Sequence, residues 1–495
     1  MYFKKKASIM FRNYESFGYI TDNRNFGYKQ ANQGENDDIG DKIVSQSGAV
    51  FLSVLGGKPQ SLDDIAKKII MQFTNVDIET IKMDAEEFYC LLESDGFIVS
   101  GETIQECNEK DTRFSYKLVE PKNEKKDCSP TKGEKSTQDF FEEYFNNEPQ
   151  LTNLHIEITS RCNERCVHCY IPHENKVNHI EPDLFYNILE QCNKMNLLHV
   201  TLSGGEPMIH DNFCDFLIKC NEYNFSVNVL SNLTLINNEI IEEMKRNRLL
   251  SVQVSLYSMD SNIHDAITQI KGSFEKTKNA ILKLKENDIP LQISCPIMKQ
   301  NLNSYNDVVV WGKAHNINVG SDYVIIARYN HTTQNLSSRL SINDVKEFSN
   351  QRIANQPEYL ELIEKEAEKK KNINPDDNVC SVCYSSICIA DNGNVYPCAG
   401  WQDYVVGNIN ETSLKDIWNN SIKVKYLRSL RKRDFPKCIQ CPENDFCTMC
   451  MVRNANENPL GDPLAVNEYF CNIAKLNKEM VSEWKGNLAN SQGKC

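Results

Sequence analysis

Residues 157–170 read EITSRCNERCVHCY and place three cysteines in a C-x3-C-x2-C run, at Cys162, Cys166 and Cys169. The run directly follows residues 154–159, whose alternating apolar and polar side chains are typical of a β-strand. A structural zinc site is normally closed by four ligands, and a disulfide takes two thiols. Three thiolates on one short loop therefore predict a metal centre with an open position.

Strand-like and helix-like segments alternate through residues 151–326. The strand-like segments read LHIEI, LHVTLSGG, FSVNVLSN, LSVQVSLYS, PLQISCPIM and INVGSDYVII, and amphipathic helical stretches separate them. Strands that are linked by crossover helices pair in parallel. The pattern predicts an α/β fold with an open or closed barrel, whose chemistry belongs at the carboxyl ends of the strands.

Candidate binding residues follow the next two strands. The segment SGGEP occupies residues 203–207 after the second strand, and Ser231-Asn232 comes after the third. A Gly-Gly pair lets a backbone approach a ligand closely, and the carboxylate of Glu206 can bind a cationic amine. These residues are therefore expected at the same end of the barrel as the three-cysteine loop.

The composition limits the class of protein. The chain has 495 residues, 40% hydrophobic and 25% charged, as expected for a globular protein of two to four domains. No apolar run reaches the roughly 18 residues that a membrane-spanning helix needs, and the start MYFKKKASIMF lacks the apolar core of a secretion signal. A net charge of -13 argues against a general nucleic-acid binder. We expect a cytoplasmic protein with no nucleic-acid or membrane partner.

A second group of cysteines lies near the C-terminus. The chain has 20 cysteines, and in a large protein of this kind clustered cysteines indicate metal or catalytic use rather than disulfides. The group comprises Cys380, Cys383, Cys388, Cys398, Cys438, Cys441, Cys447, Cys450 and Cys471. By itself its middle part would favour a zinc ribbon.

A zinc knuckle made from the three-cysteine loop and His168 is the competing interpretation of the first motif. His168 is adjacent to Cys169, so one tetrahedral ion would need awkward backbone geometry to bind both side chains. We therefore favour the open metal centre.

Residues 1–105 predict a small sheet and three helices. Residues 8–30 favour an antiparallel hairpin or three-stranded sheet, and Ser61 is placed to cap the helix SLDDIAKKIIMQF. This order resembles a winged helix-turn-helix domain. Such domains often bind DNA. The charged side chains of these helices are mostly acidic, however, and they make a poor surface for binding phosphates.

The C-x3-C-x2-C loop, followed one strand later by GGEP, resembles the radical SAM superfamily. The resemblance implies that Cys162, Cys166 and Cys169 hold a 4Fe-4S cluster whose open iron binds S-adenosylmethionine (SAM). Electron transfer to SAM then yields a 5'-deoxyadenosyl radical, and the electron would come from a donor such as flavodoxin or ferredoxin. The implied SAM-binding residues are Gly204, Gly205 and Glu206 at the methionine end and Ser231 and Ser255 near the ribose.

The C-terminal cysteines are similar to the SPASM extension of radical SAM enzymes, which usually carries two auxiliary clusters. By resemblance, Cys383, Cys398 and Cys450 hold the first cluster, with Cys380 as a candidate fourth ligand. The second cluster is assigned to Cys438, Cys441, Cys447 and Cys471. Three 4Fe-4S clusters are thus expected, and Cys388 is expected to be a buried thiol of a strand.

The N-terminal region resembles a RiPP recognition element, which binds the leader of a ribosomally made precursor peptide as an extra strand. The expected divisions are 1–105 for this domain, 106–150 for a linker and bridging helix, 151–345 for a partial (β/α)6 TIM-like barrel, 346–379 for a helical connector, 380–480 for an iron-sulfur SPASM domain and 481–495 for a tail.

The combination of these parts predicts an enzyme that crosslinks a precursor peptide by radical chemistry. The first hypothesis is a thioether between a cysteine sulfur and a carbon, as in sactipeptide or ranthipeptide maturation. Carbon-carbon crosslinking, epimerisation and sulfatase-type formylglycine formation are the alternatives among enzymes. An iron-sulfur transcriptional regulator is the alternative from another class, and its winged helix would have to bind DNA.

Overall fold

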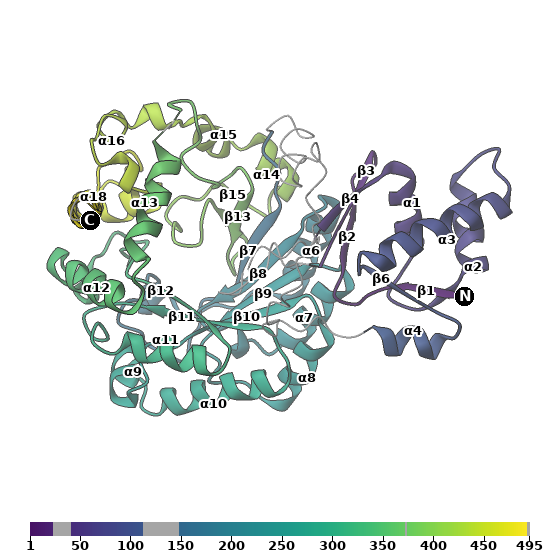
Figure 1. The fold of residues 1–495 in the computed structure, drawn as a ribbon, viewed down its shortest axis with the longest axis horizontal. Coiled ribbons are helices and arrows are strands. Elements are labelled where there is room, and N and C mark those ends of the chain that lie inside the picture. Colours follow the sequence, from purple (N-terminus) through teal and green to yellow (C-terminus); the bar gives the residue numbers. More distant parts are fainter. Residues whose placement is uncertain (23–40, 112–147, 372–373, 493–495) are drawn as a thin grey trace.

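The computed structural model describes residues 1–22, 41–111, 148–371 and 374–492. Most of the expected linker, and part of the expected hairpin at 8–30, lie outside these ranges. Within them, the chain forms an N-terminal unit, a central parallel sheet covered by helices, and a C-terminal unit (Figure 1).

The N-terminal unit contains two small antiparallel sheets and four helices. One sheet has the order β2-β3-β4, and the other has the order β5-β1-β6. The bounds are β1 Tyr2–Lys5, β2 Met10–Asn13, β3 Phe17–Thr21, β4 Asp41–Ser45, α1 Gln46–Val54, β5 Gln60–Ser61, α2 Leu62–Ile69, η1 Ile70–Gln72, α3 Ile78–Ser94, β6 Ile98–Gly101 and α4 Ile104–Lys110. The three expected helices are present, and Ser61 caps α2 by accepting a hydrogen bond from the backbone N–H of Asp64 (3.2 Å).

The central sheet confirms the predicted α/β architecture. Six parallel strands follow the order β12-β11-β10-β9-β8-β7, and they match the six strand-like segments of the sequence. They are β7 Asn153–Thr159, β8 His199–Gly204, β9 Ser226–Ser231, β10 Leu250–Ser255, β11 Leu291–Pro296 and β12 Asn318–Asp322. The intervening helices are α6 Pro182–Lys194, α7 Phe213–Glu222, α8 Asn238–Arg246, α9 Ser261–Thr268, α10 Ser273–Glu286 and α11 Tyr305–Ala314. The sheet is open, as a partial barrel requires.

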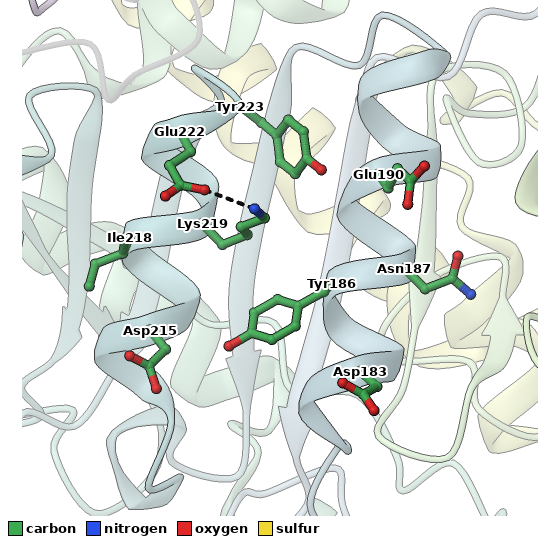
Figure 2. Close-up of a pocket in the computed structure, with 9 residues that line it drawn as sticks. All are labelled: Asp183, Tyr186, Asn187, Glu190, Asp215, Ile218, Lys219, Glu222 and Tyr223. Carbon is green, nitrogen blue, oxygen red and sulfur yellow. Dashed lines mark hydrogen bonds and ion pairs between the residues drawn. The ribbon is translucent and has the colours of Figure 1, made fainter.

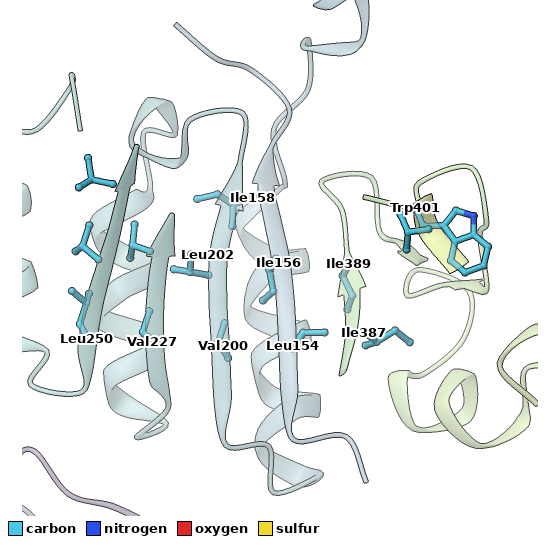
Figure 3. Close-up of a cluster of buried hydrophobic side chains, with 14 of the residues drawn as sticks. Leu154, Ile156, Ile158, Val200, Leu202, Val227, Leu250, Ile387, Ile389 and Trp401 are labelled. Atoms are coloured by element: carbon cyan, nitrogen blue, oxygen red, sulfur yellow. The ribbon is translucent and has the colours of Figure 1, made fainter. Parts of the chain in front are cut away.

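The C-terminal unit extends this sheet. Strand β13 (Ser386–Ile389) pairs in parallel with β7, and β14 (Asn394–Tyr396) and β15 (Gly407–Asn408) continue the order beyond it. Leu154, Ile156 and Ile158 of β7 belong to the same buried apolar cluster as Ile387 and Ile389 of β13 (Figure 3). The barrel and the C-terminal unit therefore share one sheet and one hydrophobic core.

Helices complete the C-terminal part of the chain. They are α12 Ile342–Asn355, α13 Tyr359–Lys370, α14 Leu414–Asn420, α15 Ile422–Ser429, α16 Pro436–Ile439, α17 Met451–Glu457 and α18 Glu468–Gln492. Helix α18 continues through residue 481, so the expected boundary of the tail does not coincide with the end of an element. No helix in the described part of the chain is long and apolar enough to cross a membrane.

The N-terminal unit contacts the barrel at the amino ends of its strands. The Arg12 guanidinium donates hydrogen bonds to the carbonyl oxygens of Leu197 and Asn224 (both 2.9 Å), just before β8 and β9. Met10 and Tyr19 are buried in one cluster with residues at the starts of β8 and β10. Since the predicted site residues follow the carboxyl ends of the strands, the N-terminal unit and the candidate site lie at opposite ends of the barrel.

Candidate active site and cysteine clusters

The three-cysteine loop leaves the carboxyl end of β7 and is held by backbone contacts. The N–H groups of Arg165 and Val167 donate to the carbonyl oxygens of Thr268 and Ile267 at the end of α9 (3.0 Å each). These bonds fix the loop without using its thiols, and all three cysteines are half-buried.

The structure brings the three thiols of this loop together. Burial raises the pKa of Cys166 well above its ordinary value, and the negative charges of Glu164, Cys169 and Cys162 raise it further. Thiolates gathered in this way repel one another unless positive charge lies between them. The donor set thus suits binding by iron, which stabilises the thiolate form.

Two polar side chains of the loop each carry a buried atom that has no hydrogen-bond partner among the described residues. Glu164 is 3% exposed, and burial raises its pKa to about 7. Its Oε2 accepts a hydrogen bond from the Cys166 thiol (3.3 Å), but its Oε1, like Nδ1 of His168, is buried without a partner among the described residues. Because buried polar atoms are nearly always hydrogen-bonded, these orphaned atoms fit a site that receives a further group.

His168 lies edge-on to Tyr257, with ring centroids 5.2 Å apart, and the Tyr257 hydroxyl points to the Cys166 thiol (3.9 Å). Among the residues that the structure describes, no group of three or more His, Cys, Asp and Glu side chains is arranged to hold a single metal ion. In a 4Fe-4S cluster, by contrast, each thiolate binds its own iron.

The Gly-Gly pair lets two backbones meet at the start of the loop. A Cβ at Gly204, where φ is 136°, would lie 1.9 Å from the Thr159 carbonyl oxygen, and a Cβ at Gly205 would lie 2.1 Å from that of Arg161. The Gly205 N–H also donates to the Thr159 carbonyl (2.7 Å). The sequence predicted close approach to a ligand, and the structure shows close approach between β8 and the cysteine loop.

Glu206 is completely buried, and this burial raises its pKa to about 7. Its Oε1 accepts hydrogen bonds from the Ser231 hydroxyl (2.7 Å) and the Met208 N–H (3.1 Å), and its Oε2 accepts one from the Asn232 N–H (2.8 Å). A carboxylate has about four acceptor positions. One position therefore remains on Oε2 for a cationic amine.

The two serines proposed for the ribose side are both engaged in hydrogen bonds. Besides donating to Glu206, Ser231 accepts a hydrogen bond from the Leu233 N–H (2.8 Å), and Ser255 is hydrogen-bonded to the Tyr257 phenol. Neither Glu164 nor Tyr257 was predicted from the sequence. Glu164 could have been identified from the sequence, because it is an acidic residue between two cysteines of the motif. Nothing in the sequence distinguishes Tyr257.

Gly205→Ala is expected to weaken SAM binding by roughly tenfold or more, because overpacking at a backbone contact costs about 1–3 kcal/mol. Isothermal titration of the reconstituted protein with SAM measures this effect. Gly57→Ala is the matched control, since a Cβ there has no atom within 4 Å and its SAM affinity should be unchanged. Normal SAM affinity in Gly205→Ala would contradict the assigned packing role.

The C-terminal cysteines form two groups in space. Electrostatic contacts between thiols join Cys380, Cys383, Cys398 and Cys450, and burial raises the pKa of Cys383 to about 12. The second group contains Cys438, Cys441, Cys447 and Cys471. These are the two sets expected from the sequence.

Two further residues, Cys388 and Arg428, lie beside the first group and are not assigned as its ligands. Cys388 is 1% exposed on β13, as expected for a buried thiol, and it lies near Cys398. Arg428 lies near Cys383, donates from Nε to the Cys383 carbonyl (2.6 Å) and stacks on Trp418. Its Nη2 is buried without an acceptor in the described ranges, which suits a neighbouring anionic cluster.

A groove of about 710 Å³ lies on the outside of the barrel, between α6 and α7 (Figure 2). Its lining includes exposed carboxylates and the ion pair between Lys219 and Glu222 (2.8 Å). It contains none of the predicted site residues.

Comparisons with known proteins agree with this geometry. Residues 156–310 match the model of the radical SAM superfamily, and residues 380–442 match the SPASM model of an iron-sulfur cluster-binding domain. These domains imply a 4Fe-4S cluster and SAM.

Similar proteins include AlbA, the antilisterial bacteriocin subtilosin biosynthesis protein of Bacillus subtilis, which is 25% identical over 63% of this chain and 69% of its own length. An AdoMet-dependent heme synthase of Methanosarcina barkeri is 24% identical over 62% of this chain and 92% of its own length. The fold is similar to that of Streptococcus suis SuiB bound to precursor peptide SuiA, with a TM-score of 0.59, 16% identity and coverage of 95% of this chain and 99% of that one.

The first model includes the three-cysteine loop, and the second includes Cys380, Cys383, Cys398, Cys438 and Cys441, while Cys447, Cys450 and Cys471 follow its last matched residue. The chain therefore contains a radical SAM domain and a C-terminal SPASM domain.

Proposed function

We propose that this protein modifies a ribosomally made precursor peptide and joins a cysteine sulfur of that peptide to a carbon. One observation carries the proposal. The fold follows SuiB over 95% of this chain, N-terminal unit included, and that SuiB structure contains a precursor peptide. AlbA, which serves the biosynthesis of a bacteriocin, supports the same class of substrate.

The proposed cofactors are SAM and three 4Fe-4S clusters. Cys162, Cys166 and Cys169 would hold the cluster that binds SAM, and when bound it supplies the electron that generates the 5'-deoxyadenosyl radical. The first auxiliary cluster would be held by Cys383, Cys398 and Cys450, with Cys380 as a candidate fourth ligand. The second would be held by Cys438, Cys441, Cys447 and Cys471.

The chain's own residues orient the reactants. The remaining acceptor position of Glu206 would bind the amino group of SAM, while the hydrogen bonds from Ser231, Met208 and Asn232 keep the carboxylate in place. The adenine would lie near His168, whose pKa burial lowers to about 4, so its ring is neutral and suited to stacking.

Mass spectrometry distinguishes the crosslink from its alternatives. A thioether removes the mass of two hydrogens and leaves one peptide thiol unable to react with iodoacetamide. The same mass loss with every thiol still reactive would indicate a carbon-carbon bond. An unchanged mass with deuterium taken up from solvent would indicate epimerisation, and conversion of a cysteine or serine side chain to an aldehyde would indicate formylglycine formation.

The N-terminal unit is proposed to bind the leader of the precursor along β4. Strand β4 pairs with β3 on one side, and no other described strand pairs with it. Lys42 of β4 forms an ion pair with Asp95 at the end of α3 (2.5 Å), which places the start of the strand within side-chain reach of that end of the helix. Leu91 lies one turn before Asp95 on α3 and is 51% exposed. An added strand would cover this side chain.

Leu91→Asp is expected to lower the affinity for the full-length precursor by roughly tenfold, since burying a leucine contributes about 1.5–3 kcal/mol. Fluorescence anisotropy with the labelled precursor measures the change. The matched control is Met71→Asp on η1, where the side chain is 84% exposed and lies on another element. SAM cleavage without peptide should be equal in both variants. Equal precursor affinity in Leu91→Asp and Met71→Asp would contradict the proposed leader site.

A further inference from the structure

Glu157 is a buried acidic residue that the proposed function does not use. It lies near the carboxyl end of β7 and is 3% exposed. Leu154, Ile156 and Ile158 point from β7 into the apolar cluster (Figure 3). Because side chains alternate along a strand, Glu157 points to the opposite face, where His155 meets Ser203 of β8. This is the inner face of the open barrel.

The carboxylate of Glu157 joins two separate loops. Its Oε1 accepts a hydrogen bond from the Tyr170 hydroxyl (2.8 Å), and its Oε2 accepts one from the Gln402 side-chain amide. Tyr170 directly follows Cys169 of the three-cysteine loop. Gln402 follows Cys398 by four residues and also donates to the Ala399 carbonyl (3.2 Å). One side chain thus connects the radical SAM loop to a cysteine loop of the SPASM domain.

This bridge begins where the backbone pairing ends. The ladder between β7 and β13 runs from Asn153 paired with Ser386 to Ile156 paired with Ile389. Glu157 is the next residue of β7. The two domains are therefore held together by the sheet and its core. The bridge connects the loops that lie beyond the last paired residues.

Breaking either hydrogen bond of this bridge costs free energy. A carboxylate removed from water is stable only when its lone pairs are hydrogen-bonded, and removing one donor leaves a buried polar group unsatisfied. Burial raises the pKa of Glu157 to about 7, and the bonds from Tyr170 and Gln402 lower it in opposition. The buried Glu157 carboxylate is therefore stable only while both loops hold their donors in place.

We propose that Glu157 is a positioning residue that fixes the three-cysteine loop relative to the Cys398 loop, so that each SAM cleavage leads to a completed peptide modification. The inference rests on the proposed function, because it concerns the coupling of its two halves. Without the bridge, the peptide radical forms at a wrong distance from the SPASM loop. It is then lost to side reactions before the modification is complete.

The test uses Glu157→Gln and Tyr170→Phe in the full-length, reconstituted protein. In Glu157→Gln the side chain keeps one acceptor oxygen and gains an NH2 group, so with its oxygen turned to the Gln402 amide the proton of the Tyr170 hydroxyl loses its acceptor. Tyr170→Phe removes only the other donor. Tyr329→Phe is the matched control: its hydroxyl accepts a hydrogen bond from Asn175 (2.6 Å) and makes none with Glu157 among the described contacts.

The readout is the amount of 5'-deoxyadenosine formed per modified peptide. We expect this ratio to rise roughly tenfold or more in Glu157→Gln and Tyr170→Phe, because small displacements of reacting groups are that costly, and to stay at the wild-type value in Tyr329→Phe. A wild-type ratio in both bridge variants, at unchanged melting temperature, overturns the inference.

A second readout needs no peptide. The magnetic interaction between the reduced clusters depends on their separation, and electron paramagnetic resonance can compare it in Glu157→Gln and Tyr329→Phe. A change confined to Glu157→Gln supports the bridge, and identical spectra overturn it. If wild-type protein modifies no precursor at all, the proposed function fails, while this comparison still decides the positioning role.

Discussion

A variant with Cys162→Ala, Cys166→Ala and Cys169→Ala is expected to release no 5'-deoxyadenosine from SAM and to lose about a third of its iron, since each 4Fe-4S cluster carries the same number of irons. The remaining iron should stay because the SPASM cysteines gather elsewhere in the fold. Anaerobic reconstitution with iron analysis and chromatography of the SAM products measures both effects.

The control for this variant keeps the number of substitutions constant. Cys90 is exposed on α3, and Cys192 and Cys220 are buried on α6 and α7, all outside the three cysteine groups. Their joint replacement by alanine should leave SAM cleavage and iron content near wild type. Zinc in place of iron in the reconstituted wild-type protein would contradict the assignment of all three sites.

Cys398→Ala and Cys450→Ala are expected to abolish peptide modification and still permit 5'-deoxyadenosine formation. Forming a carbon–sulfur bond requires the thiol to lose its proton and the product to lose an electron, and a cluster with an exchangeable iron can assist both. Cys383, Cys398 and Cys450 are the proposed core ligands of such a cluster. Cys380→Ala should therefore retain most of the modification, because Cys380 is only a candidate fourth ligand.

Cys388→Ala provides the matched control for these variants. Its thiol is buried near Cys398 but is not assigned to a cluster, so replacing it should cost some stability and little modification. Liquid chromatography with mass spectrometry of the peptide and of the SAM products gives both quantities in one sample. Full modification by Cys398→Ala would show that this cluster is not needed for the chemistry.

Local patterns in the sequence were sufficient for much of the fold. The six strands of the barrel coincide with short strand-like segments between helical patterns, and Ser61 lies directly before the helix that it caps, so both were predicted. The C-x3-C-x2-C spacing identified the cysteine loop because all of its thiols lie within eight residues of the chain.

Long-range contacts could not be predicted from these local patterns. The pairing of β13 with β7 joins segments more than two hundred residues apart, and no local signal specifies it. Strand β4 is short and was not predicted. The Glu157 carboxylate was also missed, although an acidic residue in a buried strand is itself a signal. Its partners, Tyr170 and Gln402, could be identified only from the folded chain.

The placement of the N-terminal unit sets a minimum length for the substrate. It contacts the residues just before β8 and β9, whereas the cysteine loop and Gly204 follow the opposite ends of the strands. A six-residue strand such as β8 spans about 20 Å, and an extended peptide covers about 3.3–3.6 Å per residue. A precursor whose leader is bound at β4 therefore needs a spacer of at least about six residues before its first modified position. Shortening that spacer should stop modification without weakening leader binding.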